Sequence, residues 1–184
     1  MKIGFIGLGN VGGKLANNLL KCRYRLIVRD LDPKLSKKFK KKGAVIATSP
    51  KNLAEISDVI ITCLPSPKSC SKVMTAKDGV IKGLKKNKIW LEMSTTDQSE
   101  VKRIGTMVKK KGSYVLDVPV SGGCHRAATG NISIFAGGEK KIFKKVLPIL
   151  KCMGRKILYT GELGTASILK VITNYFCLLY TSDA

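Results

Sequence analysis

Short apolar runs alternate with amphipathic runs along nearly the whole chain, and this alternation constrains the fold more than any other feature. The candidate strands are residues 2–6, 26–29, 45–47, 59–63, 89–92, 114–118, 132–135 and 157–159. Several of them are apolar at consecutive positions, as in Leu26-Ile27-Val28, which is typical of strands buried on both faces of a parallel sheet. Strands of this kind that alternate with helices predict an α/β fold with a doubly wound parallel sheet.

The expected helices carry recognisable start and stop signals. Asp32 and Ser49 each stand directly before a proline, which places a capping side chain ahead of a first-turn proline. Residues 97–111 and 140–152 have apolar residues at helical spacing, and a glycine follows each run closely. Residues 165–176 are apolar nearly all round, which indicates a helix that further protein would bury.

A glycine-rich loop joins the first candidate strand to the first helix. The loop consists of Gly7, Leu8, Gly9, Asn10, Val11 and Gly12, a G-x-G-x-x-G pattern. In a strand–loop–helix context, the first glycine permits a tight turn, the second lets the backbone approach a pyrophosphate, and the third lets helix and strand pack closely. The N-terminus of the helix attracts phosphate. The context predicts a Rossmann-type dinucleotide-binding domain, with a purely structural turn as the alternative.

The second candidate strand ends at an acidic residue that suits this cofactor. Asp30 lies 18 residues after Gly12, where a carboxylate accepts hydrogen bonds from the hydroxyls of the adenosine ribose. A carboxylate at this place repels a 2′-phosphate, so NAD is favoured over NADP. The neighbouring Arg29 weakens this preference and keeps NADP as the alternative. Asp30 can also be an ordinary residue at the end of a strand.

The charge of the chain is strongly positive but does not by itself indicate a nucleic-acid surface. There are 34 Lys and Arg residues against 12 Asp and Glu, a formal charge of +22, and all but 6 of the cationic residues are lysines. Base readout and bidentate phosphate contacts favour arginine. We therefore interpret the excess as general surface enrichment in lysine and expect no specific nucleic-acid partner.

Cysteine and histidine usage excludes several classes of site. The six cysteines stand at positions 22, 63, 70, 124, 152 and 177 without any C-x-x-C, and His125 is the sole histidine. This spacing favours neither a zinc site nor a disulfide scaffold, so we expect no metal and mostly buried, reduced cysteines. His125 is expected to lie on a loop or a cleft rim rather than to act as a catalyst.

The chain has no feature that would place it in or across a membrane. No apolar run approaches the roughly 20 residues of a membrane span, and Met1-Lys2 leads directly into the first strand without a signal peptide. We therefore expect a cytoplasmic protein without a membrane partner.

Several motifs together resemble the β-hydroxyacid dehydrogenases, which include 3-hydroxyisobutyrate dehydrogenase and are related to 6-phosphogluconate dehydrogenase. The resemblance covers residues 1–176. It rests on the segments 3–12, Leu64-Pro65, Ser94-Thr95-Thr96, Asp117-Val118-Pro119-Val120-Ser121-Gly122-Gly123, 130–138 and Gly161-Glu162-Leu163-Gly164 followed by Lys170 and Asn174. Two departures from the family are notable: Cys124-His125-Arg126 replaces residues that are usually small or apolar, and the helical domain expected after the lysine helix is absent. Within the matching segments, Glu92 stands where aspartate is usual.

The resemblance implies an NAD(P)-dependent oxidoreductase that transfers hydride between nicotinamide and a small 3-hydroxy acid or the matching semialdehyde. It places Leu64, Pro65 and Thr95 beside the cofactor. It assigns substrate binding to Ser121, Gly122 and Gly123, and catalysis to Lys170 and Asn174.

The chemistry of the reaction is compatible with a lysine at position 170. Oxidation of a hydroxy acid needs a base for the hydroxyl proton, and burial beside a cationic nicotinamide lowers the pKa of a lysine towards neutrality. Asn174 follows Lys170 by one helical turn on the same face, where its amide can hold the substrate hydroxyl. In the reductive direction Lys170 would act as the acid.

The domain organisation follows from these assignments. We expect a dinucleotide-binding domain over residues 1–162, the start of a helical C-terminal domain over 163–176, and a tail over 177–184 that resembles a translated sequencing adapter. In the family, the helical domain closes the cleft and forms homo-oligomers. Without it, we expect this chain to have little activity. The alternative functions are a non-enzymatic interaction module for nucleic acid or chromatin, and an inactive cofactor-binding fragment.

Overall fold

The computed structural model describes residues 1–182, and the side chains of residues 1–177. The strands are β1 (Lys2–Ile6), β2 (Arg25–Arg29), β3 (Val45–Ile46), β4 (Val59–Thr62), β5 (Ile89–Glu92), β6 (Tyr114–Asp117), β7 (Val120–Ser121), β8 (Ile132–Gly138) and β9 (Gly154–Gly161). The helices are α1 (Gly12–Lys21), α2 (Pro33–Lys40), α3 (Pro50–Ile56), α4 (Pro67–Thr75), α5 (Val80–Gly83), α6 (Gln98–Lys110), α7 (Gly123–Thr129), α8 (Lys140–Met153) and α9 (Thr165–Ser182).

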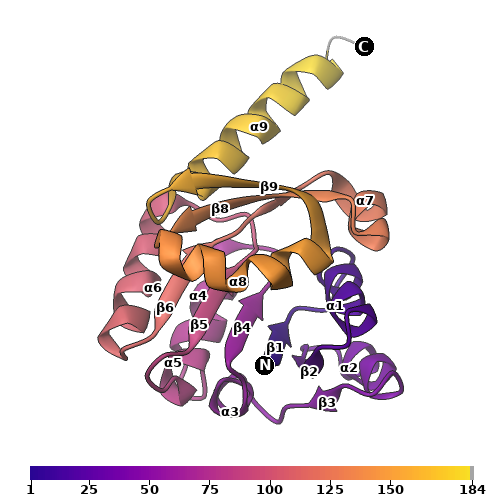
Figure 1. Ribbon diagram of the computed structural model, residues 1–184, viewed down its shortest axis with the longest axis vertical. Coiled ribbons are helices and arrows are strands. Elements are labelled where there is room, and N and C mark those ends of the chain that lie inside the picture. Colours follow the sequence, from indigo (N-terminus) through magenta and orange to yellow (C-terminus); the bar gives the residue numbers. More distant parts are fainter. Residues whose placement is uncertain (183–184) are drawn as a thin grey trace.

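A single sheet runs through the molecule, with helices on both of its faces (Figure 1). Its strand order is β3-β2-β1-β4-β5-β6-β8-β7, with β9 paired to β8. The strands β1 to β6 pair in parallel, as predicted, and the strand order reverses between β1 and β4. This is the doubly wound arrangement in which ligands bind at the carboxyl ends of the strands, beside the point of reversal.

The last part of the sheet differs from the parallel arrangement that the sequence predicts. β8 pairs antiparallel with both β6 and β7, and β9 then pairs parallel with β8. The short β7 follows β6 almost directly, and only the short α7 lies between β7 and β8. Because a parallel neighbour requires a crossover of about a dozen residues or more, β8 runs back between β6 and β7, antiparallel to both. An antiparallel edge on an otherwise parallel sheet is common in such folds.

The alternation of side chains along the strands divides the core into two layers. Phe5, Val28 and Leu91 belong to one cluster, which α1, α2, α7 and α8 cover. Ile27, Ile60 and Trp90 belong to the other cluster, which α3, α4, α5 and α6 cover. Successive residues of one strand point to opposite faces, so consecutive apolar residues fill both layers. This explains the continuous apolar runs in the sequence.

The capping signals in the sequence work as predicted. The side chains of Asp32 and Ser49 accept hydrogen bonds from the backbone N–H groups of Lys34 and Asn52, and a proline occupies the first turn of each helix. The strands β8 and β9 are longer than the predicted 132–135 and 157–159. Glycines near their ends hide them from a propensity pattern, while the pairing of β8 with β9 extends both.

The cysteine expectation is wrong for most positions. Cys22 and Cys152 form a disulfide with a Cα–Cα distance of 6.2 Å, although 130 residues separate them in the sequence. The two residues lie at the ends of α1 and α8, which pack against each other on the same face of the sheet. Of the four remaining cysteines, Cys70 is buried, Cys63 and Cys124 are partly exposed, and Cys177 is exposed. Spacing alone could not reveal a pair that only the packing of two distant helices creates.

The helix α9 starts at Thr165, as expected, and projects from the layered body (Figure 1). It continues to Ser182, beyond the predicted end at residue 176. Residues 183–184 of the predicted tail 177–184 lie outside the described residues. Among the described residues, no helix combines the length and the apolar character that a membrane crossing requires.

Candidate functional site

The glycine loop has the shape that a pyrophosphate requires. Gly7 has a φ of +96°, and a Cβ there would lie 2.2 Å from the carbonyl oxygen of Cys63. A Cβ on Gly12 would lie 2.0 Å from the carbonyl oxygen of Gly7. By contrast, a Cβ on Gly9 would meet no atom within 4 Å, so the space above the middle glycine is open. Gly7 and Gly12 therefore close the turn, and Gly9 presents bare backbone to a ligand.

The N-terminus of α1 faces the same open space. Asn10 is exposed and Val11 is partly exposed, and within the described chain no side chain caps the helix. Uncapped N–H groups at a helix start carry a partial positive charge that favours anions. The loop residues thus have a shape and an electrostatic character that suit the diphosphate of a dinucleotide, and their contact with a cofactor stays a prediction.

Asp30 is tied to the glycine loop. Its carboxylate accepts a hydrogen bond from the backbone N–H of Leu8, at 2.6 Å, and another from the N–H of Asp32, at 2.9 Å. The residue is partly buried, and each carboxylate oxygen keeps a further lone pair. Asp30 thus both holds the loop and remains able to accept hydrogen bonds from a ribose. The sequence predicts the second role but not the first.

A buried carboxylate lies beneath the adjacent strand ends. Glu92 is fully buried at the end of β5 and accepts hydrogen bonds from the Thr62 hydroxyl, the Cys70 thiol and the backbone N–H of Ser94. The indole N–H of Trp90 donates to the Thr62 oxygen at 2.8 Å. Burial raises the pKa of Glu92, and these hydrogen bonds oppose that shift. The sequence analysis did not predict these hydrogen bonds.

The network reaches the predicted cofactor loop through Ser94. The Ser94 hydroxyl accepts a hydrogen bond from the backbone N–H of Leu64 at 2.8 Å, which fixes the chain just before Pro65. Thr95 is exposed at the same edge, while the hydroxyl of Thr96 is buried without a hydrogen-bond partner among the described residues. A buried hydroxyl of this kind usually has a water or ligand partner.

The predicted substrate loop has a backbone that suits glycine. Gly122 and Gly123 have φ values of +127° and +72°, which side chains rarely adopt. Ser121 ends β7 directly before them. The backbone therefore turns sharply away from the sheet at this point, and α7 begins at Gly123.

Lys170 lies against this loop. Its Nζ donates a hydrogen bond to the Ser121 Oγ at 3.3 Å, although 49 residues separate the two in the sequence. The residue is buried, and burial lowers the pKa of Lys170. Asn174 is partly buried, one turn further along α9. The structure thus joins the predicted base to the predicted substrate loop.

Sequence reasoning placed Glu92, Ser94 and Asp117 in or beside the family motifs but gave none of them a role of its own. Asp117 is fully buried at the end of β6, and its carboxylate contacts the start of α9. The available signal was an acidic residue that ends an apolar strand, since a buried carboxylate requires nearby donors. His125 is exposed but lies on the helix α7 rather than on a loop, and Arg126 beside it is also exposed.

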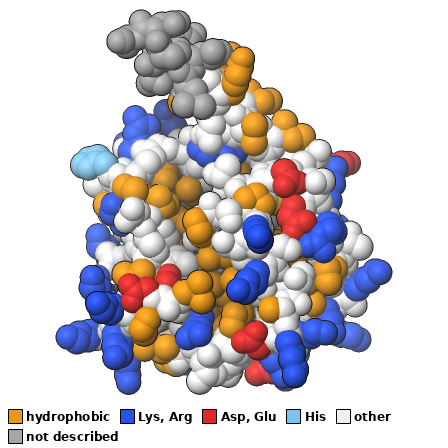
Figure 2. Space-filling view, turned by 180° about the vertical axis from the view of Figure 1, so that it is seen from behind, with side chains coloured by type: hydrophobic (Ala, Val, Ile, Leu, Met, Phe, Trp, Pro, Cys, Tyr) orange, Lys and Arg blue, Asp and Glu red, His pale blue; other side chains and the backbone are white. Residues whose placement is uncertain are grey.

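On the face that Figure 2 shows, the positive charge does not form one patch. Lys and Arg side chains are scattered around the periphery of this face, with hydrophobic side chains between them. A dispersed distribution is typical of a solvated surface rather than of a phosphate-tracking groove. The absence of a specific nucleic-acid partner stays a prediction.

A family model described as the NAD binding domain of 6-phosphogluconate dehydrogenase matches residues 2–161. Mitochondrial 3-hydroxyisobutyrate dehydrogenases from Mus musculus and Homo sapiens are 40% and 37% identical over 172 residues, which is 94% of this chain. The chain spans about half (51%) of the length of each of these relatives. Both relatives are named as mitochondrial, so the cytoplasmic location stays a prediction.

Solved structures agree with these sequence relatives. A 3-hydroxyisobutyrate dehydrogenase from Mycobacterium tuberculosis, solved with L-serine, superposes with a TM-score of 0.89 at 26% identity over 94% of this chain and 58% of that chain. An imine reductase from Myxococcus stipitatus, in complex with NADP+, superposes with a TM-score of 0.89 at 19% identity over 99% of this chain and 63% of that chain. At that identity the second likeness concerns the fold alone.

Proposed function

Since the chain belongs to the family of the NAD binding domain of 6-phosphogluconate dehydrogenase, we propose that it is the cofactor-binding part of a dehydrogenase for small 3-hydroxy acids. The reaction would interconvert a hydroxy acid such as 3-hydroxyisobutyrate and the matching semialdehyde. The observation that carries this proposal is the 3.3 Å approach of Lys170 Nζ to Ser121 Oγ, a partly desolvated amine beside a glycine-rich loop. The names of the mouse and human relatives support the substrate class.

The glycine loop would hold the diphosphate of the cofactor. Gly9 offers open backbone, the start of α1 offers N–H groups, and Leu64, Pro65 and Thr95 follow the ends of neighbouring strands at the same edge. When bound, the nicotinamide supplies the hydride acceptor or donor. The carboxylate of Asp30 favours NAD, because it would repel a 2′-phosphate.

Lys170 would move the proton that accompanies the hydride. Its lowered pKa raises the fraction of neutral amine, which can accept the proton of the substrate hydroxyl. In the reverse direction the protonated amine donates to the forming alkoxide. Asn174, on the same face of α9, would hold the hydroxyl through its amide.

The loop from Ser121 to Gly123 would bind the substrate carboxylate. The Ser121 hydroxyl and the N–H groups of the two left-handed glycines offer donors without interfering side chains. Lys170 contacts the Ser121 hydroxyl, so a carboxylate on this loop places the substrate hydroxyl within reach of the amine.

The experiment that tests the proposal uses the whole protein to which these residues belong. Oxidation of 3-hydroxyisobutyrate and glycerate is followed as formation of NADH from NAD, or of NADPH from NADP. Reduction of short semialdehydes is followed as consumption of NADH or NADPH. Replacement of the base by Lys170→Ala should lower kcat by about 100-fold or more, the scale of a lost general base, while NAD binding persists. Asp30→Ala should relax the preference for NAD. Near-normal turnover by Lys170→Ala would remove the proposed base. The 184-residue chain alone is proposed to bind cofactor with little turnover.

A further inference from the structure

A fully buried carboxylate, Asp117, ties the strand β6 to the start of the helix α9. One oxygen accepts a hydrogen bond from the backbone N–H of Gly164, at 2.8 Å. The other oxygen accepts bonds from the N–H and the hydroxyl of Ser167, at 2.8 and 3.0 Å. Three donors and the positive end of a helix offset the cost of burying this carboxylate.

The surroundings of Asp117 leave little room for it to move. Gly137 on β8 pairs with Asp117, and a Cβ on that glycine would lie 2.6 Å from the nearer carboxylate oxygen. At Gly164 the backbone has a φ of +94°, which turns the chain into α9. Both glycines thus permit a close approach that a larger residue would prevent.

The chain segments that follow Asp117 and Ser167 lead to the two parts of the proposed site, the substrate loop and the catalytic lysine. Four residues after Asp117, Ser121 ends β7. One helical turn after Ser167, Lys170 contacts the Ser121 hydroxyl. We propose that Asp117 is a positioning residue that sets the distance between the Lys170 amine and the Ser121 loop. This inference rests on the proposed function for its catalytic meaning, while the geometry it describes belongs to the chain itself.

The burial of Lys170 supports a positional role for Asp117. Burial is the main cause of the lowered pKa of Lys170. Loss of the carboxylate should let the first turn of α9 loosen, which would hydrate the amine.

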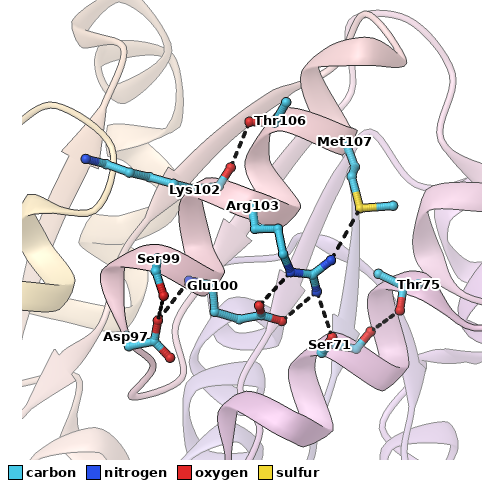
Figure 3. Close-up of polar contacts among 9 residues, drawn as sticks. All are labelled: Ser71, Thr75, Asp97, Ser99, Glu100, Lys102, Arg103, Thr106 and Met107. Carbon is cyan, nitrogen blue, oxygen red and sulfur yellow. Dashed lines mark hydrogen bonds and ion pairs between the residues drawn. The ribbon is translucent and has the colours of Figure 1, made fainter.

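A second capping aspartate in the same chain provides the matched control. Asp97 caps α6 by accepting hydrogen bonds from the N–H of Glu100 and from the hydroxyl of Ser99 (Figure 3). Asp97 is exposed, and the helix α6 that it caps contains none of the predicted site residues. A purely structural role of Asp117 would therefore resemble the role of Asp97.

The experiment follows Lys170 directly in this chain, without any turnover. The lysines are labelled by reductive methylation with carbon-13 and observed by NMR. The Lys170 signal is assigned by its absence in Lys170→Arg. The chemical shift of this signal is then recorded against pH in wild type, Asp117→Asn and Asp97→Asn. Hydrogen bonds to charged groups contribute about 1.5–3 kcal/mol each. At a pH above the titration midpoints, where the amine is neutral in every variant and only its accessibility differs, Asp117→Asn should speed the methylation of Lys170 by about tenfold or more. Its titration midpoint should move up towards that of the exposed lysines, and Asp97→Asn should leave both readouts unchanged.

The outcomes are separable from those of the proposed function. Unchanged titration and methylation of Lys170 in Asp117→Asn would overturn the positioning role, even if the variant is less stable. If Asp117→Asn does not fold, Ser167→Ala, which removes only the hydroxyl contact, should shift both readouts in the same direction by less; no shift there also overturns the inference. Calorimetry with NADH on the same variants reports on the glycine loop alone, so absent cofactor binding would count against the proposed function and not against the role of Asp117.

Discussion

The glycine loop gives a sharp test, because two of its glycines should respond to the same substitution in opposite ways. In Gly12→Ala the new Cβ would lie 2.0 Å from the carbonyl oxygen of Gly7, so α1 must move away from the strand. Overpacking of this kind costs about 3 kcal/mol. For a chain of this size, that loss lowers Tm by about 6–12 °C.

Gly9→Ala should leave the fold intact. No atom lies within 4 Å of its new Cβ, and the φ of Gly9 lies outside the left-handed region. The change in stability should therefore stay within about 0.5 kcal/mol. The methyl group occupies the space proposed for the pyrophosphate, where the loss of one charge-assisted hydrogen bond weakens NADH binding by about 10- to 100-fold.

Calorimetric titration with NADH and thermal unfolding by circular dichroism measure the two effects on the same samples. The wild-type chain serves as the reference for both. The reasoning fails if Gly9→Ala binds NADH as tightly as wild type, or if it loses as much stability as Gly12→Ala. The first result would mean that the space above Gly9 is not a cofactor site, and the second would mean that this space is not open in the folded chain.

Three further predictions concern other parts of the chain. Burial raises the pKa of Glu92, so its carboxyl binds a proton more tightly when folded; stability is greatest below the unfolded pKa and falls as pH rises through the folded one. Glu92→Gln should therefore be more stable than wild type by about 1 kcal/mol at neutral pH, and this difference in stability should vanish in acid. Urea unfolding at several pH values measures the difference, and a variant less stable than wild type at neutral pH would contradict the prediction. Replacing Cys22 and Cys152 by serine should lower the free energy of unfolding by about 2–5 kcal/mol under oxidising conditions, and equal stability with and without reductant in wild type would argue against the disulfide. The exposed apolar side chains of α9 should promote self-association, so Ile172→Lys with Phe176→Lys should shift sedimentation towards monomer; an unchanged distribution would exclude this helix as the contact.

The glycine loop illustrates what local sequence can predict. The turn at Gly7, the open backbone at Gly9 and the close packing at Gly12 follow from one short segment between a strand and a helix. The helices α2, α3, α6 and α8 are likewise predictable, because capping residues and helical spacing lie within a few residues of one another.

The site around Lys170 shows the limit of that reasoning. The resemblance to a known family indicates Lys170 and Ser121 as functional residues, but no local pattern predicts their contact across 49 residues. The network around Glu92 is equally invisible in the sequence, since its hydrogen-bond donors come from the separate elements β4 and α4 and from the residue after next.

The sequence by itself determined the alternation of strands and helices, the two buried layers of the sheet and the shape of the phosphate loop, because these depend on side-chain periodicity and on backbone freedom within a few residues. Only the tertiary structure decided the antiparallel pairing of β8, the disulfide between Cys22 and Cys152, and the contact of Asp117 with α9. Those features depend on which distant elements pack against one another. That packing reflects the free energy of the whole core rather than the preference of any single segment.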